Sequence, residues 1–67
     1  MKMLGERLRA RRKEKGVTQA WVAARLPVDR TTYTKYETGQ AEPSLENLCR
    51  LARMLDCTVG ELLGENE

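Results

Sequence analysis

Apolar residues recur every three or four positions in five short segments of the chain, and polar residues fill the positions between them. This spacing is typical of amphipathic α-helices that each bury one face. No segment alternates apolar and polar residues with the two-residue period of a strand. The pattern therefore predicts an all-α domain with helices over residues 2–15, 19–26, 30–38, 45–55 and 59–63.

Residues that favour helix ends stand at the borders of these segments. Gly16 and Gly39 follow the first and third segments, where a left-handed residue commonly ends a helix. Pro27 ends the second segment, because proline disfavours helical geometry in the residue before it. The later segments begin after side chains that accept hydrogen bonds from backbone amides. These expected N-caps are Thr18, Asp29, Ser44 and Thr58, the last in a capping box with Glu61.

The apolar face of each segment gives an expected core. Tyr33 is the main inward anchor of the third segment, which carries almost no large aliphatic side chain. The thin stripe of the first segment continues into Arg11 and Lys15, of which only the aliphatic stems could cover the core. The fourth segment follows helical spacing closely and is expected to be the core element. The other expected core residues are Leu4, Leu8, Val22, Ala23, Leu26, Leu45, Leu48, Cys49, Ala52, Leu55, Val59, Leu62 and Leu63.

Length and composition exclude several classes of function. The 67 residues make one domain, residues 1–67, which is too small to suit an enzyme with a deep pocket. There is no histidine, and Cys49 and Cys57 do not form a CxxC pair, so we expect two free buried thiols and no metal site. We expect no catalytic residue, cofactor or small-molecule ligand. No apolar run is long enough to span a membrane, which makes the cytoplasm the expected location.

Charge is distributed unevenly along the chain, although the net charge is only +2. Residues 1–16 carry seven basic and two acidic side chains, whereas residues 40–67 carry two basic and six acidic ones. A solvated basic helix is the ordinary explanation of such a run. The asymmetry also suits a domain that binds a polyanion with one side.

Residues 18–38 contain two short helical segments joined by a tight turn, and the second segment has a polar outer face. This is the arrangement of a helix-turn-helix, whose second helix lies in the major groove of DNA. Arginine and lysine donate hydrogen bonds to guanine there, and threonine offers a hydroxyl and a methyl group. The residues expected to contact base edges are Arg30, Thr31, Thr34 and Lys35.

The stretch VTQAWVAARLPVDRTTYTKYETGQAEPSLENL resembles the helix-turn-helix core of the phage-repressor and Cro-like (XRE-type) family of transcriptional regulators. The resemblance extends from Leu4 to Leu63 and implies the compact five-helix fold of lambda-repressor-like DNA-binding domains. The features that agree in register are Arg12, Thr18, Gln19, Glu37, Gly39, Pro43, Ser44 and the ending from Leu55 to Leu63.

The resemblance also implies roles for individual residues. Arg30, Thr31 and Lys35 are similar in position to residues that touch bases. Gln19 is similar to a residue that meets a phosphate and braces the recognition helix. Arg12 and Glu37 match a pair that forms a structural ion pair between the first helix and the end of the third. The further residues expected to contact the DNA backbone are Thr18, Thr32, Tyr36 and Gln40.

The resemblance implies that the protein is a repressor that binds, as a homodimer, to a palindromic operator on double-stranded DNA. Such a repressor belongs to a prokaryote, where it is associated with the nucleoid, or to a phage.

Leu62 and Leu63 are adjacent and cannot both face one narrow core stripe. We therefore expect one of them, with Val59 or Met54, to pack across a two-fold axis.

The alternative to a DNA-binding repressor is an antitoxin-like regulator or a protein-interaction module on the same fold. A pure interaction module would show little binding to duplex DNA at any salt concentration.

Three positions depart from the family pattern, and the first is Arg11, which stands where relatives often have an apolar residue. Pro27 stands where relatives commonly have glycine, which excludes a left-handed turn residue and leaves the angle between the second and third helices open. Trp21 stands where relatives often have a polar residue. It either folds against Arg25 as a cation–π pair or marks a surface that binds a partner.

Overall fold

The computed structural model describes residues 3–65, which form five α-helices and no strand. The helices are α1 (Leu4–Lys15), α2 (Gln19–Arg25), α3 (Arg30–Thr38), α4 (Leu45–Met54) and α5 (Val59–Leu63). The expected all-α architecture is confirmed. Lys2, which the sequence assigned to the first helix, lies outside the described residues.

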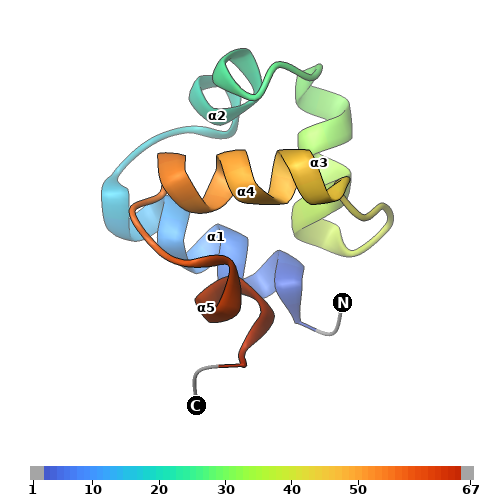
Figure 1. The fold of residues 1–67 in the computed structure, drawn as a ribbon. Helices are drawn as coiled ribbons and strands as arrows, with labels where there is room; N and C mark the ends of the chain where they lie inside the picture. Colours follow the sequence, from blue (N-terminus) through green and yellow to red (C-terminus); the bar gives the residue numbers. More distant parts are fainter. Residues whose placement is uncertain (1–2, 66–67) are drawn as a thin grey trace.

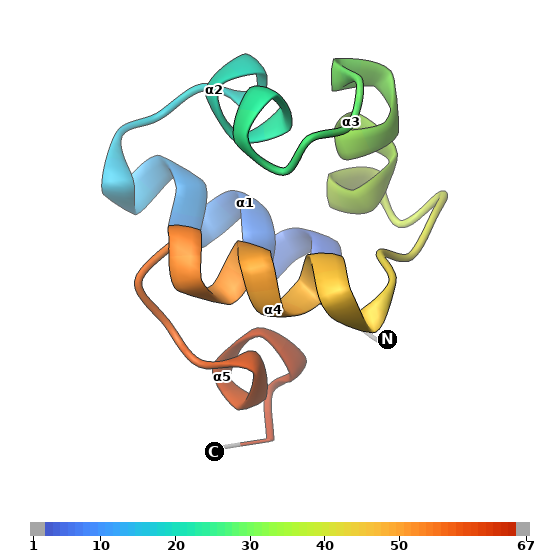
Figure 2. The same ribbon diagram turned by 45° about the horizontal axis from the view of Figure 1, so that its top comes forward.

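The two helices of the helix-turn-helix lie at one end of the molecule and α5 lies at the opposite end, with α1 and α4 between them (Figure 1). Figure 2 shows the same order after a turn that brings the top of the molecule forward. α1 contacts both α3 and α5, while α2 packs on α3 and α4 packs on α5. α1 therefore links the helix-turn-helix to the C-terminal part of the chain.

The helix ends follow the local sequence signals. Each of the four expected N-cap side chains accepts a hydrogen bond from the backbone amide three residues later, and Glu61 completes the capping box. Gly16 and Gly39 end their helices with φ values of 80° and 84°, the left-handed conformation that glycine adopts without steric cost. These boundaries were predictable because a cap depends only on residues within one helical turn.

The turn between α2 and α3 passes through Pro27. α2 ends at Arg25, and the peptide bond between Leu26 and Pro27 is cis, which the sequence did not indicate. The backbone N–H of Val28 donates to the carbonyl oxygen of Ala23 at 3.0 Å and closes the turn. The helix-turn-helix therefore forms without the glycine that relatives commonly have at this position.

Tyr33 is the large fully buried side chain that α3 contributes to the core, as the sequence indicated. Leu8 of α1 and Leu26 at the end of α2 are also fully buried, and Leu62 of α5 closes the core at the opposite end. Leu63 is only half-buried, which agrees with the expectation that two adjacent leucines cannot share one narrow stripe. Each helix thus contributes a short apolar face to one continuous core.

The expected buried face of α4 was wrong at two positions. Leu45 is 71% exposed and Cys49 is exposed, so the expectation of two buried thiols fails for Cys49. Helical side chains lean toward the N-terminus, so Leu45 at the first position of α4 projects past the end of the core. Cys49 lies about 100° around the helix from Leu48 and faces outward. The buried residues of α4 and its C-cap are Leu48, Leu51, Ala52 and Leu55.

Two basic side chains continue the thin apolar stripe of α1, as expected. The side chains of Arg11 and Lys15 are 32% and 30% exposed, so most of each stem is covered. Their charged groups pair with Glu61 at 3.3 Å and with Asp56 at 2.7 Å. These two long side chains thereby hold α1 against the C-terminal segment of the chain.

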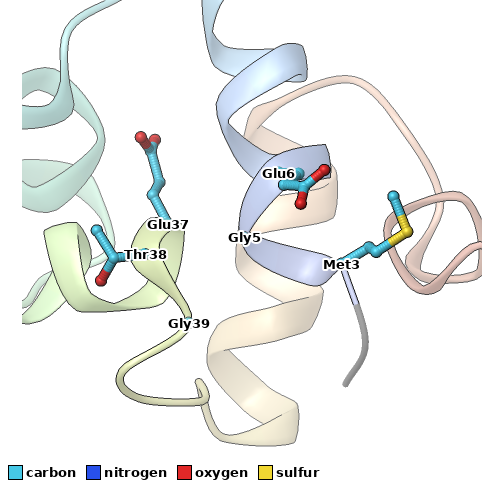
Figure 3. Close-up of a pocket in the computed structure, with 6 residues that line it drawn as sticks. All are labelled: Met3, Gly5, Glu6, Glu37, Thr38 and Gly39. Carbon is cyan, nitrogen blue, oxygen red and sulfur yellow. The ribbon is translucent and has the colours of Figure 1, made fainter.

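The backbones of α1 and α3 approach each other closely at Gly5 (Figure 3). A Cβ atom on Gly5 would lie 2.7 Å from the carbonyl oxygen of Tyr36 and closer still to the carbonyl oxygen of Glu37. Only a residue without a side chain therefore permits this contact between the two helices.

We predict that Gly5→Ala destabilises the fold by about 2 kcal/mol, because an overpacking cost of about 3 kcal/mol outweighs the gain of about 1 kcal/mol that alanine brings to a helix interior. Ala10→Gly at an exposed position of the same helix is the matched control and should lose only the helix-propensity term. Urea unfolding followed by circular dichroism measures both variants. A Gly5→Ala protein more stable than the wild type would show that the two backbones are not in tight contact.

Candidate nucleic-acid interface

The outer face of α3 is polar and open to solvent at its N-terminal half. Arg30, Thr31 and Lys35 are exposed, and Thr34 is half-buried beside them. Asp29 starts the helix by accepting a hydrogen bond from the Thr32 amide at 2.7 Å. The Thr32 side chain and backbone lower the pKa of the Asp29 carboxyl. The two long basic side chains therefore stand on the surface of a helix whose first turn is fixed.

α3 is held to the core through its opposite face. The ring of Tyr33 is fully buried and meets the ring of Tyr36 edge to face, with the ring centroids 6.2 Å apart. Burial and the neighbouring Glu37 carboxylate raise the pKa of the Tyr33 hydroxyl, so this group stays neutral. Two aromatic side chains thus do the anchoring that several aliphatic residues do in other helices.

The ring of Tyr36 lies mostly in the core. The sequence indicated a contact of this residue with the DNA backbone, which stays a prediction, and only 7% of Tyr36 is exposed. It lies one helical turn from Tyr33, and residues three positions apart share a face of a helix. The face that buries Tyr33 therefore buries Tyr36 as well, and we assign Tyr36 to the core.

The expected ion pair between Arg12 and Glu37 is present and nearly buried. The guanidinium of Arg12 donates to both carboxylate oxygens of Glu37, from Nε at 2.7 Å and from Nη2 at 3.2 Å. The two side chains are only 12% and 4% exposed. Arg12 Nη1 also donates to the carbonyl oxygen of Val17 at 2.9 Å, which ties in the segment before α2. The pair fastens α1 to the last turn of α3.

Gln19 extends this ion pair to α2. Its Nε2 donates to Glu37 Oε1 at 3.1 Å, and its Oε1 accepts from the Thr34 hydroxyl at 3.1 Å. The same hydroxyl lies 2.9 Å from the carbonyl oxygen of Arg30. Gln19 therefore touches α3 at two points one turn apart and braces it, as the resemblance implied.

The residues expected at the DNA backbone are placed unequally. Thr18 is exposed at the N-cap of α2, where its oxygen accepts from the Trp21 amide at 3.0 Å. Thr32 is half-buried in the first turn of α3, and Gln40 is exposed just beyond the end of that helix. These positions lie at both ends of α3 and at the start of α2. They therefore lie around the exposed face formed by Arg30, Thr31 and Lys35 and are not part of it.

Trp21 folds against its own helix. The guanidinium carbon of Arg25 lies 3.9 Å from the centroid of the Trp21 ring, and Arg25 Nη1 donates to the Trp21 carbonyl oxygen at 3.1 Å. Lys15 Nζ lies 5.9 Å from the same centroid. The half-buried ring is thus covered by basic side chains of its own chain, and the first of the two explanations for Trp21 is confirmed.

A shallow hollow of about 140 Å³ lies between the start of α1 and the end of α3 (Figure 3). Glu6 and Glu37 contribute carboxylates to it, and Thr38 contributes a hydroxyl. It lies at the opposite end of α3 from Arg30. Within residues 3–65, no group of three or more acidic, cysteine or histidine side chains could hold a metal ion, and no helix is long and apolar enough to cross a membrane.

The chain belongs to the helix-turn-helix domain family, whose model matches residues 3–63. It is 41% identical over 59 residues to the transcriptional repressor RstR of the cryptic phage CTXphi in Vibrio cholerae, covering 88% of this chain and 53% of that protein. It is 43% identical over 61 residues to the prophage-derived regulator YonR of Bacillus subtilis, covering 91% of this chain and 56% of the relative. The chain thus spans about half the length of the curated relatives it matches.

Solved structures agree with this assignment. The P22 c2 repressor in complex with a synthetic operator matches with a TM-score of 0.88 and 34% identity, covering 97% of this chain and 98% of that one. The solution structure of the DNA-binding domain of the same repressor matches with a TM-score of 0.85 and 37% identity, covering 90% and 79%. The resemblance to phage-repressor regulators is therefore confirmed, and Pro27 has not altered the overall fold.

We predict that Arg12→Met costs about 3 kcal/mol of unfolding free energy or more, because it leaves the Glu37 carboxylate nearly buried without its partner. Arg50→Met is the matched control, since Arg50 pairs with Glu46 on the surface, where such a pair contributes about 1 kcal/mol or less. Urea denaturation compares the two variants. Equal losses would show that the Arg12 pair is effectively solvated.

The stability of the fold should also depend on pH through Glu37. Burial raises the pKa of this carboxyl, but hydrogen bonds from Arg12 and Gln19 and the nearby Tyr33 hydroxyl together hold it below its ordinary value of 4.5. The stabilisation is therefore complete above pH 4.5 and is lost as the pH falls through the lowered pKa. An NMR titration of the Glu37 side-chain carboxyl should give a midpoint below 4.5, and a midpoint at or above this value would contradict the assignment.

Proposed function

We propose that this chain is a sequence-specific, double-stranded DNA-binding transcriptional regulator, a repressor that reads the major groove with α3. The observation that carries the proposal is the structure of α3 itself. Arg30, Thr31 and Lys35 are exposed on one side, while Tyr33 is fully buried on the other. A helix so anchored presents donors to base edges at a fixed angle. The P22 c2 repressor, which has the same fold, has been solved in complex with a synthetic operator, and this supports the binding of duplex DNA.

The phosphate contacts in this proposal come from the surroundings of α3. Gln19 is held in place by two hydrogen bonds and offers its remaining N–H to a phosphate, with Thr18, Thr32 and Gln40 as neighbouring donors. Contacts of this kind set the register of the protein on the duplex, and base contacts then discriminate between sequences. Each good base contact contributes about 1 to 3 kcal/mol against a wrong base.

The proposed assembly is a homodimer that reads two half-sites of a palindromic operator, about 34 Å apart. Leu62 is buried in the core and is unavailable for a dimer contact. Val59, Leu63 and Met54 are only partly buried and remain the proposed contact residues.

We further propose that the protein acts in the cytoplasm, has no catalytic activity and needs no cofactor. The alternative of a protein-interaction module loses support, because Arg25 covers Trp21.

Selection of bound duplexes from a random pool, followed by affinity measurements at two salt concentrations, tests the function. We expect a palindromic consensus and an affinity that falls steeply with salt, because phosphate contacts release counterions. Sedimentation of the protein on the selected duplex should show two copies per site. Absence of duplex binding at low salt would refute the proposed function, and a single copy on every duplex would refute the homodimer.

We predict different effects for the two classes of contact. Arg30→Ala should relax the base preference at one position of the selected site, since its exposed guanidinium has no role in the core. Gln19→Ala should weaken binding to all duplexes by a similar factor. Titration against the selected duplex and a set of single base-pair variants measures both effects. Identical, uniform losses for the two variants would contradict the division into reading and positioning contacts.

A further inference from the structure

Four polar side chains form a continuous chain of hydrogen bonds across the three helices around the candidate interface. Arg12 of α1 donates to Glu37 of α3, Gln19 of α2 donates to the same carboxylate, and the Thr34 hydroxyl donates to Gln19. The two ends of the Gln19 amide both contact α3, at Glu37 and at Thr34, which lie one turn apart. The orientation of the Gln19 amide is therefore set from both sides by α3.

The chemistry of the partners allows only one orientation of that amide. The Glu37 carboxylate is ionised beside Arg12 and can only accept hydrogen bonds, so the NH₂ group of Gln19 faces it at 3.1 Å. The opposite orientation would bring two acceptor oxygens together at that distance. The amide oxygen then faces Thr34, whose hydroxyl is the donor that satisfies it at 3.1 Å.

The Thr34 hydroxyl is committed to the protein itself. It carries a single hydrogen and lies within reach of two acceptors, Gln19 Oε1 at 3.1 Å and the Arg30 carbonyl oxygen at 2.9 Å. One hydrogen can be shared between two acceptors in a three-centre hydrogen bond. A threonine that donates a hydrogen bond to a base must expose this hydrogen. Thr34 is instead half-buried against α2.

We propose that Thr34 is a positioning residue that fixes the Gln19 amide for its phosphate contact, and that it does not read bases. The inference rests on the proposed DNA-binding function and changes the role expected for Thr34 from the sequence. Glu37 uses one hydrogen of the Gln19 NH₂ group, and Thr34 keeps the amide from turning about its last torsion. The second hydrogen of the Gln19 NH₂ group then points in one fixed direction, from which it can donate to a phosphate.

Thr34→Val tests the proposal, because it removes the hydroxyl and keeps the branched shape of the side chain. We expect binding to the selected duplex and to each of its single base-pair variants to weaken by one common factor, about three- to tenfold for one lost hydrogen bond. Thr34→Ser restores the hydroxyl and should recover most of this loss. In a Gln19→Ala background, Thr34→Val should have no further effect, since the group that it positions is gone.

A changed preference at one base pair in Thr34→Val, or losses that simply add in the double variant, would overturn the proposal. The free protein provides a second measurement that needs no DNA. The side-chain amide resonances of Gln19 should shift and exchange with water faster in Thr34→Val and not in Thr34→Ser. Unchanged amide resonances would also overturn it. Failure of the wild type to bind any duplex, with these amide shifts still present, would refute the DNA-binding function and leave the contact between Thr34 and Gln19 intact.

Discussion

The nearly buried ion pair between Arg12 and Glu37 is the interaction on which the helix-turn-helix depends. It joins α1 to the last turn of α3, and Gln19 attaches α2 to the same carboxylate. Removing a charge pair of this kind from water costs free energy, and only multiple hydrogen bonds in good geometry compensate that cost. Here the guanidinium makes three such bonds. The pair thus joins three helices at one carboxylate.

This constraint explains how a short helix with little aliphatic surface stays docked. α3 buries two tyrosine rings and one glutamate, while Arg30, Thr31 and Lys35 are exposed and lie outside the core. A second constraint acts at Gly5, where the backbones of α1 and α3 meet without an intervening side chain. The hydrogen bonds of Glu37 and the close backbone contact at Gly5 together hold α3 in place, whereas a helix of a small domain usually depends on a row of buried leucines. The outer face of α3 is thereby left available to solvent and to DNA.

The sequence predicted those features that depend on neighbours within one helical turn. Caps, glycine ends and the anchoring by Tyr33 belong to this class, and so does the stacking of Arg25 on Trp21. Predictions of burial failed for Leu45 and Cys49, because helical spacing gives the relative directions of side chains but not where the neighbouring helices end. The bond between Thr34 and Gln19 joins residues 15 positions apart, and no local pattern signals such a contact. The residues proposed to read bases were identified from their side-chain chemistry. Their exposure was predictable because this helix has few apolar side chains and therefore makes few contacts with the core.

The exposure of Arg30, Thr31 and Lys35 has an evolutionary consequence. Substitutions of exposed residues without special contacts change stability by about 0.5 kcal/mol or less, so these three positions can diverge while the scaffold persists. Tyr33, Glu37 and Gly5 have no such freedom. Descendants of one ancestral chain could therefore acquire new target sequences by single steps, each passing through a protein that still folds.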